Sequence, residues 1–146
     1  MSTEAFTWKV QNDASPEDLA LLSNGVFAHG RALASDGNAE SISCLVRHQG
    51  VVVAGASGRT EYTRLFVNHL WVAEEIRNQG IARRILTEME SGAAARGCRD
   101  ALIETLDESV AALYARLGYQ SIAVIHGYVG RFNRHIMLKA SIASTQ

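Results

Sequence analysis

The stretch Arg77-Asn78-Gln79-Gly80-Ile81-Ala82 decides the fold that this sequence predicts. It lies between an apolar segment, Leu65 to Val72, that indicates a strand and an amphipathic segment that indicates a helix. A strand that ends in a glycine-containing turn and opens into a helix leaves several backbone N–H groups without partners at one point. The positive end of the helix dipole lies at the same point, so the junction favours an anionic ligand such as a phosphate.

Length and composition indicate one folded domain over residues 1–146. Of the residues, 47% are hydrophobic and only one is proline, which argues against disorder. The net charge of -1 gives no overall attraction to nucleic acid, so any anion site must be local. Residues 1–4 lack the basic and apolar regions of a signal peptide, and no apolar run approaches the roughly 20 residues of a membrane helix. We therefore expect a cytoplasmic protein with no nucleic-acid or membrane partner.

The chain has two cysteines, Cys44 and Cys98. They show neither the spacing of metal ligands nor a pairing pattern. We therefore expect two reduced, buried thiols and no metal site.

Hydrophobic periodicity and turn residues predict the other elements. In chain order, these are a strand at Phe6 to Val10, a helix that begins at Ser15-Pro16-Glu17-Asp18, strands at Ser41 to His48, Val51 to Ser57 and Arg64 to Val72, a helix from Ile81 to a cap at Gly97, a strand from Ala101 to Leu106, a helix from Ser109 to Leu117, and strands at Tyr119 to His126 and Phe132 to Lys139. The order β-α-βββ-α-β-α-ββ predicts an α/β layer architecture with a mixed sheet.

Four finer expectations accompany this order. Gly25 and Gly30 are expected to loosen or break the first helix. The segment Gly58 to Thr63 is expected to connect two strands. The side chain of Trp71 is expected in the core, and Glu90 is expected away from the apolar face of its helix.

A second segment, Leu113-Tyr114-Ala115-Arg116-Leu117-Gly118-Tyr119, follows the turn by about thirty residues. The turn at 77–82 matches the pattern Arg/Gln-x-x-Gly-x-Gly/Ala and follows Leu70-Trp71-Val72. With these two features and the segment 113–119, the chain resembles the GNAT superfamily of acyl-CoA-dependent N-acyltransferases. The resemblance covers about Phe6 to Lys139. It implies a mixed, mostly antiparallel central sheet of six to seven strands flanked by helices. It also implies acetyl-CoA as the co-substrate, no metal, and transfer of an acetyl group to a primary amine.

The resemblance places the acyl-CoA on the turn and on the strand before it. The backbone of Leu70 and Val72 would pair with the peptide-like pantetheine, and an N–H near Val72 would donate to the thioester oxygen. The turn N–H groups would hold the pyrophosphate, and Gly80 lets the backbone come close. Asp107 stands where many relatives have an asparagine that contacts pantetheine, and an aspartate can accept but cannot donate. The expected cofactor residues are Leu70, Trp71, Val72, Arg77, Asn78, Gln79, Gly80, Ile81, Ala82, Asp107 and Tyr114.

Three side chains are the candidates for proton transfer. By resemblance, Tyr114 would be the general acid that protonates the departing thiolate, whereas its structural alternative is packing between helix and sheet. Glu104 and His69 are the candidates for the base that receives the proton of the amine, and His126 is a weaker one. For each of them, a structural or rim position is the alternative.

The acceptor pocket is expected between the segment Phe27 to Asn38 and the hairpin His126 to Arg134. There, Tyr128, Arg131 and Arg134 could meet an acidic or polar acceptor. The small chain favours a small-molecule amine, while peptide N-termini and lysine side chains stay open. The sequence does not name the amine, the acyl length or the oligomeric state, for which we consider a homodimer.

Two other classes of function compete with this one. The first is a non-catalytic acyl-CoA sensor or regulator on the same fold. The second is an α/β protein that binds a phosphate or nucleotide through the turn, although the P-loop motif Gly-x-x-x-x-Gly-Lys-Ser/Thr is absent.

Overall fold

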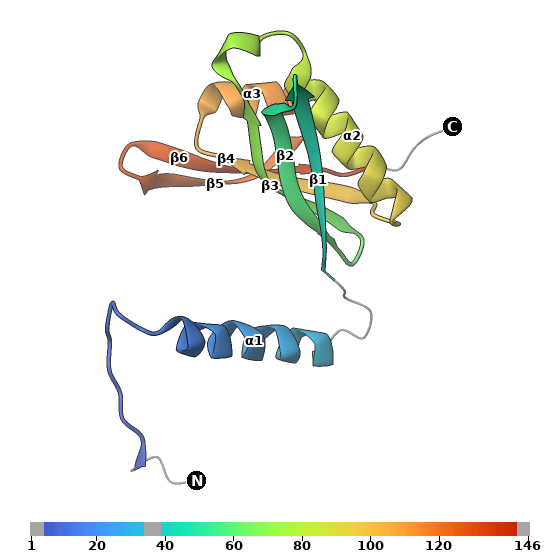
Figure 1. Cartoon of the computed structure of the whole chain (residues 1–146). Helices are drawn as coiled ribbons and strands as arrows, with labels where there is room; N and C mark the ends of the chain where they lie inside the picture. Colours follow the sequence, from blue (N-terminus) through green and yellow to red (C-terminus); the bar gives the residue numbers. More distant parts are fainter. Residues whose placement is uncertain (1–4, 34–38, 143–146) are drawn as a thin grey trace. The chain divides into compact units, whose positions relative to one another are not determined.

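The computed structural model describes residues 5–33 and 39–142, which belong to two units. The N-terminal unit covers residues 1–37 and the sheet unit covers residues 38–146, and each is described by itself (Figure 1). In the described part of the chain, no helix is long and apolar enough to cross a membrane.

The N-terminal unit contains helix α1 (Pro16–Leu33). Its predicted start is confirmed, because the hydroxyl of Ser15 accepts a hydrogen bond from the backbone N–H of Asp18 at 3.1 Å. The expectation that Gly25 and Gly30 break the helix is wrong, since α1 runs through both. Each glycine costs about 1 kcal/mol relative to alanine, and the surrounding leucines and alanines are strong helix formers.

The predicted strand at Phe6 to Val10 is also wrong. This segment is irregular, although its apolar residues alternate with polar ones. A strand needs a neighbour that takes up its backbone N–H and C=O groups, and the described residues of this unit offer none. Alternation alone therefore does not predict a strand here.

The sheet unit is built on six strands in the spatial order β1-β2-β3-β4-β6-β5. Strands β3 and β4 are parallel, and all the other neighbours are antiparallel. The elements of this unit are β1 (Glu40–His48), β2 (Val51–Glu61), β3 (Arg64–Val72), the 3-10 turn η2 (Glu74–Ile76), α2 (Ile81–Ala95), β4 (Asp100–Thr105), α3 (Glu108–Arg116), β5 (Gln120–Val129) and β6 (Phe132–Lys139). The predicted mixed, mostly antiparallel sheet is confirmed.

Strand β2 is longer than predicted, because Gly58 lies inside it and not in a connection. An added Cβ at Gly58 would lie 2.0 Å from the carbonyl oxygen of Phe66. The glycine therefore permits a close approach of β2 to β3, and it does not mark a turn. The connection is reduced to Tyr62 and Thr63.

Helices α2 and α3 lie on the same side of the sheet (Figure 1). Between them and the strands is a core that includes Leu65, Ile85, Leu86 and Met89, each at most 1% exposed. The sheet face away from these two helices is called the far face below. Trp71 lies on the far face and is 53% exposed, so the expectation of a core position is wrong.

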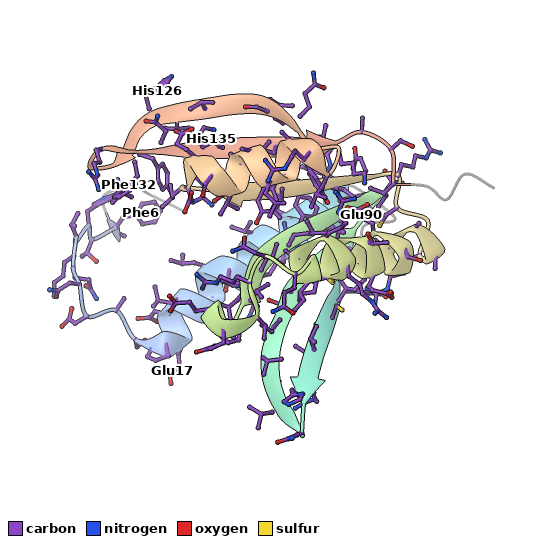
Figure 2. The ribbon with its side chains drawn as sticks, turned by 90° about the horizontal axis from the view of Figure 1, so that it is seen from above. Phe6, Glu17, Glu90, His126, Phe132 and His135 are labelled. Carbon is purple, nitrogen blue, oxygen red and sulfur yellow. The ribbon has the colours of Figure 1, made fainter. Side chains whose placement is uncertain are left out.

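The expectation that Glu90 lies away from the apolar face of its helix is also wrong. It is buried on α2, between the helices and the sheet (Figure 2). The hydroxyl of Tyr119 donates to Glu90 Oε2 at 2.9 Å, and the ammonium of Lys139 donates to Oε1 at 2.8 Å. The carboxylate can be buried because both of its oxygens have partners.

The pairing of β3 with β4 covers only half of each strand. Arg64 to Val67 pair with Asp100 to Ile103, and the two strands separate beyond that point. On its other side, β3 has a bulge: His69 is opposite Ser57 and Val67 is opposite Gly58, so that Asn68 is an extra residue. A bulge bends its strand. This bulge lies where β3 and β4 begin to diverge.

Candidate active site

The separation of β3 from β4 leaves the end of β3 with one free backbone edge. The N–H of Ala73 donates to the carbonyl of Val53 in β2 at 2.9 Å. Backbone groups alternate in direction along a strand, so those of Leu70 and Val72 point away from β2 and into the gap beside β4. The Nε of Arg77 donates to the carbonyl of Val72 at 2.9 Å, which agrees with this direction.

The turn after β3 presents its backbone to open space. Asn78 and Gly80 have φ angles of 63° and 78°, which belong to the left-handed region. Gly80 is the N-cap of α2, no side chain caps this helix start, and its first turn contains no acidic residue. An added Cβ at Gly80 would meet nothing within 4 Å. The first N–H groups of α2 are therefore available to an anion.

Arg77 makes a contact that the sequence does not predict. Its guanidinium binds the end of β3 and so connects the first residue of the turn to the last residue of the strand. This contact fixes the turn against the free edge. The side chain therefore has a structural role in addition to any contact with a ligand.

Tyr114 lies on the helix side of the gap. It is 4% exposed, and its ring centroid is 6.1 Å from that of Tyr119. Burial raises the pKa of Tyr114 to about 12, so that the phenol is protonated at neutral pH. Within the described residues, no side-chain hydrogen bond occupies its hydroxyl, in contrast to the bond from Tyr119 to Glu90.

Glu104 and His69 lie on the far face. Glu104 is the first residue of β4 beyond the paired half, and its Oε2 accepts from Arg134 Nη2 at 2.6 Å. The Nδ1 of His69 is 3.4 Å from the hydroxyl of Ser57. The candidate acid and the candidate bases thus flank the gap from opposite faces of the sheet.

Asp107 caps α3. Its Oδ1 accepts from the hydroxyl and the N–H of Ser109 at 2.6 and 2.8 Å and from the N–H of Val110 at 3.3 Å. These hydrogen bonds, above all the one from the Ser109 hydroxyl, hold the pKa of Asp107 below its usual value. One carboxylate oxygen therefore has a structural function, and Oδ2 is the atom left for a ligand.

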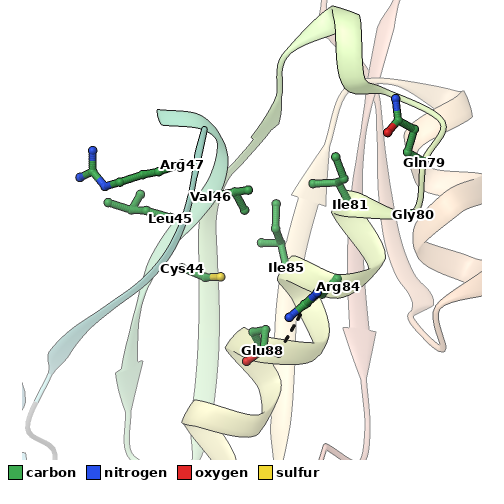
Figure 3. Close-up of a pocket in the computed structure, with 10 residues that line it drawn as sticks. All are labelled: Cys44, Leu45, Val46, Arg47, Gln79, Gly80, Ile81, Arg84, Ile85 and Glu88. Atoms are coloured by element: carbon green, nitrogen blue, oxygen red, sulfur yellow. Dashed lines mark ion pairs between the residues drawn. The ribbon is translucent and has the colours of Figure 1, made fainter. Parts of the chain in front are cut away.

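A cavity of about 600 Å³ lies on the other side of α2, against the edge strand β1 (Figure 3). It shares Gln79, Gly80 and Ile81 with the turn, but neither Tyr114 nor Glu104 lines it. Its thiol, Cys44, is free, and burial raises its pKa, which disfavours the reactive thiolate. The cavity borders the turn and is not the place where the candidate acid and bases meet.

The structure adds two features that the sequence does not predict: the bulge at Asn68 and the pairing of Glu104 with Arg134. The bulge has no sequence signal, because asparagine is common in turns and bulges alike. The ion pair joins residues thirty positions apart, and it depends on the register of β4 against β6. Neither position could be inferred without the sheet order.

The chain matches the profile of the acetyltransferase (GNAT) family over residues 6–119. It is 29% identical over 110 residues to acetyltransferase Atu2258 of Agrobacterium fabrum, covering 75% of this chain and 80% of that protein. It is also 29% identical over 92 residues to blasticidin-S acetyltransferase of Streptomyces morookaense, covering 62% and 68%.

Solved structures show the same fold. An acetyltransferase from Bacillus cereus superposes with a TM-score of 0.79 at 22% identity and covers 90% of this chain and 96% of its own. An aminoglycoside 6'-N-acetyltransferase in complex with coenzyme A superposes with a TM-score of 0.63 at 17% identity, covering 88% and 89%. From the family match and the two relatives, it follows that the chain belongs to the GNAT family and is an acetyltransferase.

Proposed function

We propose that this protein transfers an acetyl group from acetyl-CoA to the primary amine of a small molecule. The observation that supports this reaction best is the gap between β3 and β4, with Tyr114 on one face of the sheet and Glu104 on the other. A donor in the gap would have a proton source on the helix side and a proton acceptor on the far face.

The residues around the gap fit acetyl-CoA. The open space at Gly80 and the uncapped start of α2 suit a pyrophosphate. The backbone of Leu70 and the N–H of Val72, whose carbonyl accepts from Arg77, suit the acyl-pantetheine. Acetyl-CoA would supply the acyl thioester. The N–H of Val72 would donate to the carbonyl oxygen of that thioester, where negative charge develops.

The proposed chemistry needs two proton transfers. The amine nitrogen attacks the acyl carbon, so that a C–N bond forms and the C–S bond breaks. Tyr114 donates its phenolic proton to the departing sulfur, and Glu104 accepts the proton that the nitrogen loses. Both side chains then return to their starting states by exchange with water. His69, which is held near Ser57, is the alternative acceptor of the proton.

Several observations support the finer parts of the proposal. Two similar proteins are named for small-molecule acceptors, blasticidin S and an aminoglycoside, which favours a small amine over a peptide. Cys44 and Cys98 are free thiols, which are typical of a reducing compartment, so we propose a cytoplasmic location.

We include a homodimer in the proposal. All ten residues of the edge strand β5 are exposed, and the strand has no lysine, glutamate or proline to protect its edge. A second copy could pair with it. Light scattering should give twice the chain mass, and Ile122→Lys, which places a charge on this edge, should give the monomer. A wild-type monomer at all concentrations would contradict the dimer.

The proposal is tested by ligand binding and turnover together. Acetyl-CoA should raise the melting temperature, whereas ATP and NAD should not. An amine panel should release thiol, and mass spectrometry should find the N-acetylated product. Stabilisation by acetyl-CoA without turnover on any amine would favour the sensor. No stabilisation at all would contradict both functions.

A further inference from the structure

The side of the gap where the acceptor would bind is basic. The segment 120–139, which forms β5, β6 and their turn, contains two arginines and no aspartate or glutamate, while its one lysine, Lys139, binds Glu90 on the helix side. Against this background, the carboxylate of Glu104 comes from the neighbouring strand β4 and makes an ion pair with Arg134. Next to the gap, a negative and a positive group therefore stand side by side.

Both partners of this pair keep unused hydrogen-bonding capacity. A guanidinium has five N–H donors and a carboxylate accepts about four bonds, whereas the structure has one bond between them, at 2.6 Å. The side chains of Arg134 and Glu104 are 30% and 34% exposed, so a ligand can reach them. The guanidinium carbon lies 5.0 Å from the ring centroid of Tyr128. The ring covers one face of the guanidinium and leaves its N–H edge accessible to a ligand.

The other charged groups nearby do not disturb this arrangement. On the far face, His69 of β3 is held near Ser57. The imidazole of His135 lies on the helix face, 2.9 Å from the carboxylate of Glu108 in α3. The hydrogen bond to Glu104 raises the pKa of Arg134, so that its charge is present at any working pH.

We propose that the acceptor is a zwitterionic amine, whose nitrogen contacts Glu104 and whose carboxylate or similar anionic group contacts Arg134. This inference rests on the proposed function, because it assumes that Glu104 faces the attacking amine. A second positive charge in place of the anionic group would lie against Arg134 and be repelled. The pair therefore selects amino-acid-like acceptors over diamines and over amides of the same amino acids.

Matched acceptors test this selection. 4-Aminobutyrate and putrescine have similar chain lengths but opposite charges at the far end, and leucine differs from leucinamide in the carboxylate. The wild-type protein should use the carboxylate-bearing member of at least one pair with a kcat/KM at least about tenfold higher. In Arg134→Met this ratio should fall to about one, and Arg134→Lys should keep part of it.

Arg59→Met is the matched control. Arg59 also lies on the far face, pairs with the carboxylate of Glu61 at 3.2 Å and has its guanidinium 4.0 Å from the ring centroid of Phe66. It belongs to the paired half of the sheet, so its loss should leave the acceptor ratio and the acetyl-CoA dissociation constant unchanged.

The outcomes separate this inference from the proposed function. If thiol is released with other amines but neither pair favours its carboxylate-bearing member, the acceptor class is wrong and the enzyme assignment stands. A preference that survives in Arg134→Met also overturns the inference. If no amine releases thiol and acetyl-CoA does not stabilise the protein, the proposed function itself has failed.

Discussion

Strands β3 and β4 run side by side over one half of their length and separate over the other. In the paired half, Leu65 and Ala101 are fully buried, and Arg64 makes two hydrogen bonds to its register partner Asp100, at 2.9 and 3.0 Å. In the separated half, β3 no longer pairs with β4, the Val72 carbonyl accepts from Arg77, and Glu104 faces away from the helices. The same two strands thus hold the fold together at one end and present reactive groups at the other.

Deletion of Asn68 is the strongest test of this comparison. Val67 and His69 already lie on opposite faces, so the deletion would remove the bulge without moving either side chain to the other face. β3 should then straighten and close the gap, and the affinity for acetyl-CoA should fall by about 100-fold or more. Calorimetric titration measures the affinity, while circular dichroism and cooperative melting check the fold. Asn68→Ala, which keeps the bulge, should bind normally, and normal binding by the deletion variant would contradict the role of the bulge.

Tyr114→Phe tests the helix side of the gap. The rate constant kcat should fall roughly 100-fold, because the departing sulfur loses its proton donor. Stability should change by less than about 1 kcal/mol, since no side-chain hydrogen bond to this hydroxyl is lost. Steady-state kinetics and chemical denaturation measure the two effects.

Tyr119→Phe is its control and should behave in the opposite way. It removes the hydrogen bond to the buried Glu90, which should cost about 1–3 kcal/mol of stability while kcat stays the same. An unchanged kcat in Tyr114→Phe over the whole pH range would exclude Tyr114 as the acid.

Gly80→Glu tests the turn. The change adds a side chain where φ is 78° and places a negative charge where the pyrophosphate would bind, so the affinity for acetyl-CoA should fall roughly 10- to 100-fold. Gly97→Glu is the matched control, because Gly97 has a φ of 91° and equally open surroundings just after the other end of α2. Equal losses of affinity in both variants would mean that strain, and not the site, causes the effect.

The sequence predicts the elements of the sheet unit well where local chemistry determines them. The predicted strands Ser41 to His48 and Val51 to Ser57 are joined by a two-residue hairpin at Gln49 and Gly50, whose φ angles of 51° and 82° few residues tolerate. The helix predicted from Ile81 is confirmed, and helical spacing places its buried residues Ile85, Met89 and Ala93 on one face.

The errors arise where a residue type has two physical uses. Gly58 serves close strand contact and not a turn, and Glu90 is polar but buried with two partners. The site was predictable only as a list of residues. That Tyr114 and Glu104 flank the gap from opposite faces depends on the sheet order and on which β4 residues still pair with β3, and neither is encoded locally.

Alkaline unfolding should sharpen the contrast between buried and exposed phenols. The pKa of Tyr114 is raised from 10.0 to about 12, so the unfolded chain loses this proton at a lower pH than the folded protein does. The contribution of this phenol to the free energy of unfolding is therefore fully present below pH 10. About 2–3 kcal/mol of it is lost as the pH rises to about 12. Denaturation at several pH values should show a smaller loss in Tyr114→Phe. Tyr128→Phe, which changes an exposed phenol, should behave like the wild type.

Arg64 lies in the paired half, and the substitution Arg64→Met should have the smallest effect of these variants on the protein. It removes both hydrogen bonds to Asp100, but the arginine side chain is 42% exposed, so solvent already weakens the pair and the loss should be about 1 kcal/mol. The kinetic constants should stay the same, because Val67 and Ile103 still pair next to the gap. A change in KM for acetyl-CoA at unchanged stability would show that the paired half sets the width of the gap. The two halves would then be one mechanical unit, and the division between fold and chemistry along β3 and β4 would be wrong.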